Sequence, residues 1–267
     1  MAERVTVSVD EGVADVQLNR PEKLNGPDLA MFEALVETGE TLARDRSLRA
    51  VVLSGAERAF SAGLDFASFM AMRAENRAVK DLLEREAGSP ANFAQQAAYV
   101  WTALPVPVIA AVQGACFGGG LQIALGADIR IVAPDAQLSV MEIKWGLVPD
   151  MTGTQTLRHL VRLDVLKELT FTGRIVSGTE AVELGLATRA SDLPLEAALA
   201  LAREIAAKSP DAIRAAKALT NGAVTATLEE GLVLEATLQR SVMGGANQLE
   251  AVRANMEKRA PKFSDPA

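Results

Sequence analysis

Cysteine and histidine are almost absent from this sequence, which has one of each, Cys116 and His159, among 267 residues. A single cysteine excludes a disulfide within the chain and is typical of proteins from a reducing compartment. The chain also has no CxxC or HExxH motif, so it offers no ligand set typical of a structural zinc site. We therefore expect no metal centre and a cytoplasmic location.

Long apolar runs and an excess of positive charge are also missing. No apolar run reaches the roughly 18 residues that a membrane-spanning helix needs, and the opening MAERVTVSVDEGVADV lacks the basic-then-apolar pattern of a secretory signal. The formal net charge of −7 argues against nucleic acid as the main partner. We expect a protein that binds neither membrane nor nucleic acid, although a local basic cluster could still hold an anionic ligand.

Strand and helix patterns alternate in the first part of the chain. Alternating apolar residues around the turn DEG predict a hairpin within 5–18, and RAVVLSG (49–55) and PVPVIAAVQG (105–114) are typical of buried strands. Strands joined through helices imply parallel pairing with both faces of the sheet covered. The other elements expected here are helices over 29–43 and 90–104, a helix after the glycines at 118–120, and strands over 128–134 and 136–140.

The remainder of the chain shows helical patterns only. Four long helices are expected, over 194–207, 210–221, 227–241 and 246–258. We therefore predict an α/β protein with a mixed core over 1–192 and a helical region over 193–267.

Two glycine-containing loops are candidates for a ligand site. SAGLD (61–65) follows one predicted strand, and GACFGGG (114–120) follows another. The ends of parallel strands meet at one edge of a sheet, where α/β ligand sites collect. Glycines let the backbone approach a ligand closely, and two convergent N–H groups stabilise a developing oxyanion. For either loop alone, tight turns or close packing remain an equal alternative.

Other familiar motifs are absent. The glycines do not form G-x-G-x-x-G, and no Gly-Lys-Ser/Thr follows them, which excludes a Rossmann fingerprint and a P-loop. Ser61 and His159 could suggest a hydrolase pair. However, Ser61 lacks a nucleophile-elbow context and His159 lies in a helical pattern, so we interpret the histidine as structural.

Five longer stretches occur in the order known from one family. They are LNRPEKLN (18–25), RAVVLSGAERAFSAGLDF (49–66), PVIAAVQGACFGGGLQIALGADIRI (107–131), GLVPD (146–150) and LTFTGRIVSGTEAVELGLA (169–187). By these stretches the sequence resembles the crotonase (enoyl-CoA hydratase/isomerase) superfamily over nearly its whole length. The resemblance implies a spiral of ββα units and a C-terminal helical region that assembles trimers, often pairs of trimers.

The resemblance also implies an acyl-CoA thioester substrate, with coenzyme A entering as part of that substrate and no separate cofactor. It implies oxyanion-hole amides at Leu64 and Gly119, and a role in fatty acid metabolism. Contacts to coenzyme A are implied for a set of residues in the two loops and in the C-terminal KRAPKF segment, the latter serving a neighbouring subunit: Lys23, Leu24, Ala62, Asp65, Phe66, Lys262 and Phe263.

The carboxylates decide which reaction is expected. Hydratases of this family use two glutamates, and the positions that match them here hold Gln122 and Glu142. An amide has no proton to exchange near neutral pH, so two-carboxylate hydration is in doubt. The resemblance implies that Glu142 alone could move a proton between C2 and C4, as in Δ3,Δ2-enoyl-CoA isomerases. Asp150 matches a second acid of the dienoyl-CoA isomerases, although capping of the next helix is an equal alternative.

Three functions follow from this reasoning. We favour isomerase-like proton transfer with Glu142 as base, ahead of an enoyl-CoA hydratase that tolerates Gln122 and a non-catalytic acyl-CoA binder. Dehalogenase, decarboxylase, hydrolase and racemase branches of the family reuse the same oxyanion hole, and fold alone does not choose between them. The segment 67–100 is expected to line the acyl pocket with Phe66, Phe69, Met70 and Met72, unless these residues only pack in the core.

Overall fold

The computed structural model describes residues 3–65, 70, 82–85 and 88–266. Its main sheet has six strands in the order β1-β2-β3-β4-β6-β9. The hairpin β1–β2 is antiparallel, and every later pairing in this sheet is parallel, as expected. The strands are β1 (Val5–Asp10), β2 (Val13–Leu18), β3 (Ala50–Gly55), β4 (Val108–Val112), β6 (Ile129–Val132) and β9 (Arg189–Ala190).

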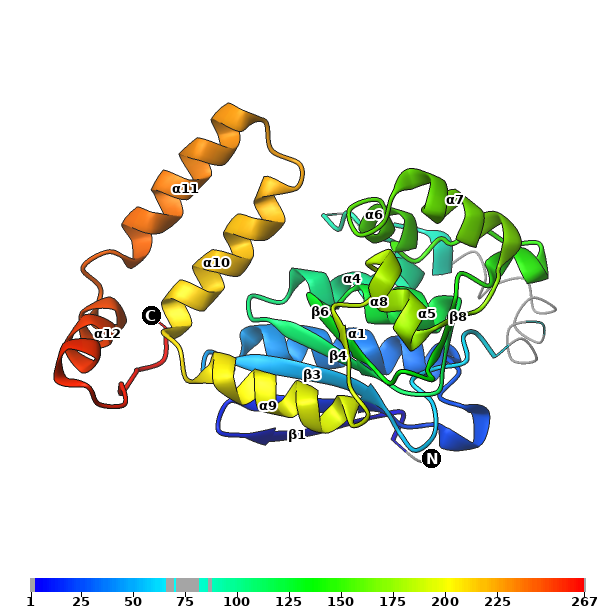
Figure 1. Cartoon of the computed structure of the whole chain (residues 1–267), viewed down its shortest axis with the longest axis horizontal. Coiled ribbons are helices and arrows are strands. Elements are labelled where there is room, and N and C mark those ends of the chain that lie inside the picture. Colours follow the sequence, from blue (N-terminus) through cyan, green and yellow to red (C-terminus); the bar gives the residue numbers. More distant parts are fainter. Residues whose placement is uncertain (1–2, 66–69, 71–81, 86–87, 267) are drawn as a thin grey trace.

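Helices cover both faces of this sheet (Figure 1). Alternate residues of β3 point to opposite faces, so Val51 and Leu53 join the core beneath α1 (Leu29–Arg44) and α4 (Phe93–Ala103). Val52 instead packs against α9 (Pro194–Ala206). This double coverage explains why β3 and β4 are continuous apolar runs in the sequence.

A second sheet of three short strands carries the glycine loop. It consists of β5 (Ala115–Phe117), β7 (Gln137–Ser139) and β8 (Val176–Ser177). The strand β5 lies within 114–120, a stretch that was predicted only as a loop because three residues between glycines are too few to show a period. Cys116 of β5 also bridges to Ser61, which places the two glycine-containing loops side by side.

Short helices surround this second sheet, and longer ones end the chain. The short ones are the 3-10 turns η1 (Pro21–Lys23) and η2 (Glu142–Trp145) and the helices α5 (Gly119–Leu125), α6 (Gly153–Leu157), α7 (Leu163–Thr172) and α8 (Gly178–Leu184). The last three helices are α10 (Pro210–Ala223), α11 (Leu228–Val242) and α12 (Ala246–Glu257), which we call the arm. Among the helices of the described residues, none is long and apolar enough to cross a membrane.

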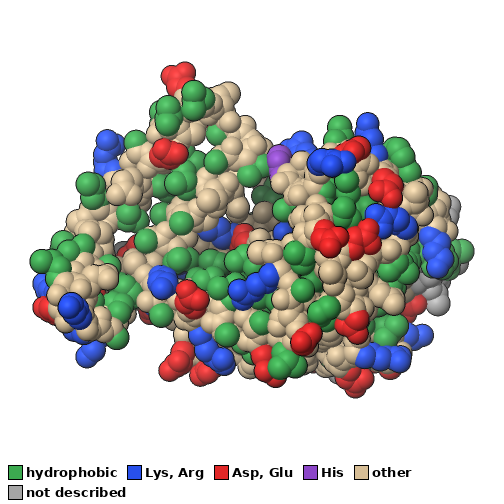
Figure 2. Space-filling model, viewed as in Figure 1, with side chains coloured by type: hydrophobic (Ala, Val, Ile, Leu, Met, Phe, Trp, Pro, Cys, Tyr) green, Lys and Arg blue, Asp and Glu red, His purple; other side chains and the backbone are tan. Residues whose placement is uncertain are grey.

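The arm extends away from the sheet (Figure 1), and hydrophobic side chains lie along its surface (Figure 2). No residue of α11 is buried in the single chain. The predicted division at residue 192 stays a prediction; α9 lies beyond it in sequence yet packs on the main sheet, so the helices that leave the sheet begin with α10.

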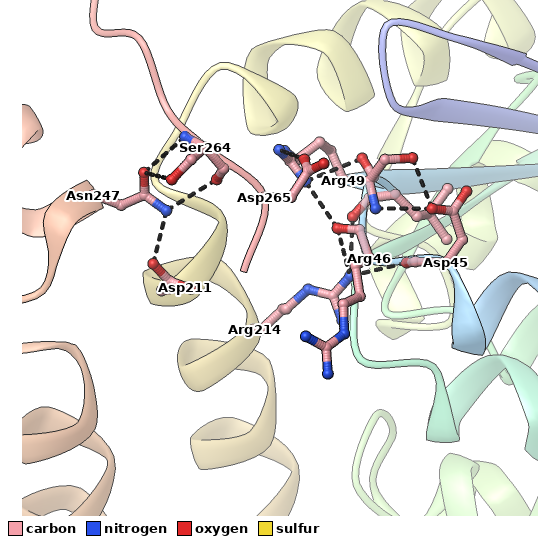
Figure 3. Close-up of polar contacts among 10 residues, drawn as sticks. Asp45, Arg46, Arg49, Asp211, Arg214, Asn247, Ser264 and Asp265 are labelled. Atoms are coloured by element: carbon pink, nitrogen blue, oxygen red, sulfur yellow. Dashed lines mark hydrogen bonds and ion pairs between the residues drawn. The ribbon is translucent and has the colours of Figure 1, made fainter. Parts of the chain in front are cut away.

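Polar side chains fasten α10 to the core. The Arg214 guanidinium donates to the carbonyl oxygens of Asp45 and Leu48, at 3.2 Å each (Figure 3). One turn further along, the buried Lys217 ammonium donates to the Val106 carbonyl at 2.9 Å and pairs with Asp128 at 2.8 Å. Two basic side chains of α10 therefore attach the arm to the core, mainly by hydrogen bonds to backbone carbonyl oxygens next to α1, β3 and β4.

Candidate active site

A buried asparagine joins the first loop of the site to the second. Asn25 is fully buried and accepts the Arg20 amide at 2.8 Å. Its own amide group donates to the carbonyl oxygens of Ala56 and Ala59, at 2.9 and 2.8 Å. The Leu24 carbonyl in turn accepts the Ala62 amide at 2.9 Å. The segment 20–26 is thereby held against the loop that contains SAGLD.

Glycines bring the second loop against the third. Gly63 has φ +83°, and a Cβ there would lie 2.7 Å from the Phe117 carbonyl oxygen and 3.8 Å from the Gly119 nitrogen. Gly120 approaches Ser61 so closely that a Cβ would meet the Ser61 side chain at 2.6 Å. Larger residues at 63 or 120 would push the loops apart. In this part of the molecule the glycines therefore serve close approach of backbones.

The amides of Leu64 and Gly119 lie on these abutting loops and, among the described residues, have no hydrogen-bond acceptor. The amide of Gly118 donates to the Ser139 carbonyl at 2.9 Å, and that of Asp65 donates to the Pro27 carbonyl at 3.2 Å. Across the described part of the chain, by contrast, no acceptor takes a hydrogen bond from the amide of Leu64 or Gly119. These are the two amides that the sequence analysis assigned to an oxyanion.

Gln122 and Glu142 lie in direct contact next to the glycines. The Gln122 Nε2 donates to Glu142 Oε1 at 2.6 Å. The Gln122 Oε1 accepts two backbone amides, from Met151 at 2.7 Å and from Gly153 at 3.0 Å. Both side chains are buried, with residue exposures of 3% for Gln122 and 8% for Glu142. A Cβ on Gly118 would sit 3.4 Å from Glu142 Oε1, so the carboxylate adjoins the glycine loop.

The second oxygen of Glu142 is buried and, within the described residues, has no hydrogen-bond partner. Burial raises the pKa of Glu142 above its ordinary value of 4.5, and the negative charge of Asp150 raises it further, while the hydrogen bond from Gln122 lowers it. A carboxylate with a raised pKa and one uncommitted oxygen is suited to accept and return a proton.

Asp150 lies near Glu142 but does not cap a helix. The N-cap of α6 is Thr152, with no side-chain hydrogen bond to the helix. The capping alternative is therefore wrong for α6. Asp150 reaches the surface of the single chain, yet the protein atoms around it exclude enough water to raise its pKa.

The hydrolase pair that the sequence analysis rejected does not form. The buried Ser61 hydroxyl donates to the Asn25 carbonyl at 2.9 Å, and it accepts the Gly63 amide at 3.3 Å. His159 is exposed and accepts a hydrogen bond from Arg158 at 2.9 Å.

The residues expected to contact coenzyme A fall into two places. Lys23, Leu24, Ala62 and Asp65 lie in the first two loops; Lys23 is exposed, and the Asp65 carboxylate pairs with Arg20 at 2.9 Å. Phe66, Phe69 and Met72 lie outside the described residues, and Met70 is 53% exposed.

Lys262 and Phe263 lie beyond α12, on the arm side of the chain (Figure 1). The Lys262 amide donates to Glu250 of α12 at 2.7 Å, and nearby Asp265 pairs with Arg49 at 2.5 Å (Figure 3). In the single chain they are thus held by the arm and the start of β3. A role for them in a neighbour's site stays a prediction.

Three contributors to the site were not singled out from the sequence. Arg20 and Asn25 tie the loops together, and the turn Met151–Gly153 binds the Gln122 amide oxygen. The sequence signal for the turn is the glycine within PDMTG (149–153).

The main sheet is mostly parallel, and the loops that follow its strands bring the Leu64 and Gly119 amides close to the buried Glu142 carboxylate. The protein therefore belongs to the class of α/β proteins that bind ligands at the ends of parallel strands. The enoyl-CoA hydratase/isomerase family profile matches residues 8–266. The chain therefore belongs to the enoyl-CoA hydratase/isomerase family, the crotonase superfamily, whose fold it shares and whose members act on acyl-CoA substrates.

Named relatives include both hydratase-type and isomerase-type proteins. The chain is 33% identical to the human mitochondrial enoyl-CoA hydratase domain-containing protein 2, over 97% of this chain and 88% of the relative. It is 34% identical to the rat mitochondrial Delta(3,5)-Delta(2,4)-dienoyl-CoA isomerase, over 96% of this chain and 80% of the relative. The crystal structure of an enoyl-CoA hydratase from Bacillus anthracis superposes with a TM-score of 0.88 at 31% identity, covering 97% and 98% of the two chains.

Proposed function

We propose that the protein is an enoyl-CoA isomerase in which Glu142 moves a proton along the acyl chain of a CoA thioester. The observation that carries this proposal is the pair Gln122–Glu142. One member is an amide committed to three hydrogen bonds, and the other is a buried carboxylate with one uncommitted oxygen. Such a pair contains one proton carrier, which suffices for isomerisation, whereas hydration in this family uses two.

The reaction needs no co-reactant. Glu142 removes a proton from C2 of a 3-enoyl-CoA, so a C–H bond breaks, an O–H bond forms, and the electron pair delocalises over the thioester as a dienolate. The backbone amides of Leu64 and Gly119 hold the enolate oxygen, and loss of one such donor costs about 3–4 kcal/mol of transition-state stabilisation in comparable sites. Glu142 then returns the proton to C4, which leaves a 2-enoyl-CoA.

Asp150 extends this scheme to longer shifts. Its negative charge raises the pKa of Glu142, and burial raises the pKa of Asp150 itself above its ordinary value. With Asp150 as the second proton carrier, a 3,5-dienoyl-CoA becomes a substrate. The similarity to the rat dienoyl-CoA isomerase supports this substrate class.

Turnover of 2-enoyl-, 3-enoyl- and 3,5-dienoyl-CoA by the purified protein tests the proposal. We expect double-bond migration with the last two and slow hydration of the first. Fast hydration without migration would contradict it and favour the hydratase alternative. Glu142→Gln is expected to lower the isomerisation rate about 10²- to 10⁴-fold. An unchanged rate would mean that Glu142 is not the base, and no turnover of any of the three substrates by the wild type would support a non-catalytic binder.

We further propose that the arm assembles copies of the chain into trimers, or pairs of trimers, and that Lys262 and Phe263 complete the CoA site of a neighbour. Large apolar side chains that a single chain leaves exposed support this assembly; Leu228, Val233 and Met243 are 81%, 62% and 65% exposed. If the tail serves a neighbour's CoA site, Phe263→Ala raises the KM for acyl-CoA and leaves kcat within about twofold.

A further inference from the structure

The orientation of the Gln122 amide is set by its partners. Its Oε1 accepts two backbone N–H groups from the turn Met151–Gly153, and its Nε2 faces the Glu142 carboxylate. A reversed amide would oppose donor to donor at the turn and oxygen to oxygen at Glu142. The two backbone donors therefore dictate that Gln122 presents N–H, and nothing else, to Glu142.

We propose that Gln122 is a positioning residue that holds Oε1 of Glu142 and thereby directs Oε2 to the substrate as the proton-carrying oxygen. The inference rests on the proposed function, because it names the atom of Glu142 that does the proton transfer. Oε1 is engaged at 2.6 Å by the Gln122 amide, whereas Oε2 is buried without a partner among the described residues. The two oxygens of one carboxylate thus have different roles.

The turn Met151–Gly153 is shaped to receive an oxygen at position 122. Thr152 adopts φ +70°, a left-handed conformation uncommon for this residue type, and the amides on either side of it, of Met151 and Gly153, both donate to Gln122. Gly153 is required as well, because a Cβ there would lie 2.7 Å from the Gln122 Oε1. The strained backbone of Thr152 and the absence of a side chain at Gly153 thus both serve to bind the side-chain amide of Gln122.

The same geometry explains why an amide suits this chain better than an acid. A glutamate at 122 would keep one oxygen on the two backbone donors and place its other oxygen where Nε2 now meets Glu142 Oε1. Two carboxylate oxygens at such a distance have to share a proton. Glu142 would then be held partly neutral, whereas Gln122 leaves it free to ionise and act as the base.

Among the described residues, few other charges surround Glu142. Neither α5 nor α6 carries a charged residue, and Asp150 is the acidic neighbour whose field reaches it. The charged residues on its own turn and on α7, which packs against that turn, are all exposed: Lys144, Asp164, Lys167 and Glu168.

Two substitutions test the inference in the full-length protein. Gln122→Met keeps the side-chain volume and removes both polar ends; we expect kcat/KM for 3-enoyl-CoA to fall about 10- to 100-fold, the range of one hydrogen bond to a charged group. The acid limb of its pH profile moves to higher pH, because the hydrogen bond that lowers the pKa of Glu142 is lost. Gln122→Glu keeps the oxygen acceptor and moves the acid limb upward as well, through the shared proton.

Gln137→Glu, the same change at an exposed strand residue, serves as the control and leaves the pH profile unchanged. Both position-122 variants are checked for folding by circular dichroism. If both fold, keep kcat/KM within about twofold of wild type and have the acid limb of the pH profile at the same pH as wild type, the positioning role is wrong. If Gln122→Met does not fold, Gln122→Glu alone decides.

An infrared titration separates this inference from the proposed function. The carboxyl band that disappears in Glu142→Gln reports the protonation of Glu142 without any turnover. We expect that band to titrate at higher pH in both position-122 variants than in wild type. Equal titration overturns the positioning role, while absence of isomerisation by the wild type overturns only the proposed function.

Discussion

At the scale of the residue, the candidate site contains a carboxylate, Glu142, that the fold keeps largely out of water. Burial makes the ionised form of Glu142 costly, and Gln122 offsets only part of that cost with one hydrogen bond. A group held in this way disfavours the folded state at neutral pH. Such a cost is expected where function needs an uncommitted polar atom.

Glu142→Gln is therefore expected to stabilise the protein while it removes activity. The folded-state pKa of Glu142 is raised above the ordinary 4.5. The folded state thus binds the proton more tightly, and stability from this group is present below pH 4.5 and is lost as pH rises through the raised pKa. We expect the variant to melt a few degrees (about 2–4 °C per kcal/mol) above wild type at pH 8, and the difference to shrink in acid.

Melting curves at several pH values check this expectation. Glu183→Gln, at an exposed helix position, is the matched control and should melt as wild type does at every pH. An unchanged or lower melting temperature for Glu142→Gln at pH 8 would mean that the folded protein solvates this carboxylate well.

At the scale of the element, the site depends on how closely three loops approach. The bridge between β5 and Ser61 and the contact of Gly120 with Ser61 keep the Leu64 and Gly119 amides on abutting backbones. None of these contacts involves a long side chain, so little in the geometry can adapt to added volume.

Gly120→Ala tests this close packing. Its Cβ would meet both main-chain and side-chain atoms of Ser61 at 2.6 Å. We expect a loss of about 1–3 kcal/mol in the free energy of unfolding and a lower kcat, because the two amides move apart. Gly231→Ala is the control: nothing lies within 4 Å of its Cβ in α11, and alanine there should be neutral or stabilising by up to about 1 kcal/mol. Equal effects in the two variants would contradict the packing argument.

The attachment of α10 depends on a buried lysine that pairs with Asp128 at the surface. Lys217 donates to the Val106 carbonyl and to Asp128, and its side chain is 5% exposed. Burial lowers its pKa, and the charge of Asp128 opposes that change. Lys217→Met removes the hydrogen bonds of the ammonium to the buried Val106 carbonyl and to Asp128, so we expect a loss of about 1–3 kcal/mol and faster hydrogen exchange in α10. Lys167→Met, at an exposed position of α7, should change neither quantity.

At the scale of the whole molecule, the single chain exposes large apolar side chains along the arm, which supports the proposed assembly. Leu232 and Val233 are 55% and 62% exposed on α11. Leu232→Glu is expected to produce smaller particles in light scattering, because a charge in an apolar contact between copies is costly. Gln239→Glu, an exposed position of the same helix, adds equal charge and should leave the particle size unchanged. If both variants and the wild type give particles of the same size, Leu232 does not lie in a contact between copies of the chain.

Much of this architecture could be predicted from local patterns. The alternation in β1 and β2, the apolar runs of β3 and β4, and the Asp28 cap of α1, whose side chain accepts the Met31 amide, are encoded within a few residues each. The strand β5 escaped prediction because it is three residues long and is defined only by its partners.

The residue types at the site were also evident from the sequence. Gln122 and Glu142 could be singled out, together with the glycines that precede them, because side-chain chemistry is a property of the residue. That chemistry already excludes Gln122 as an acid or a base and leaves Glu142 as the nearby carboxylate.

Only the tertiary structure decided how those residues act. The amide of Gln122 is oriented by donors 29 and 31 residues away, and Glu142 is 20 residues away. No local pattern specifies such contacts, because they arise where separate loops converge at the edge of the sheet. The fold thus determines which oxygen of Glu142 is held and which has no partner within the described part of the chain, since hydrogen bonding depends on the positions of partners that only packing brings together.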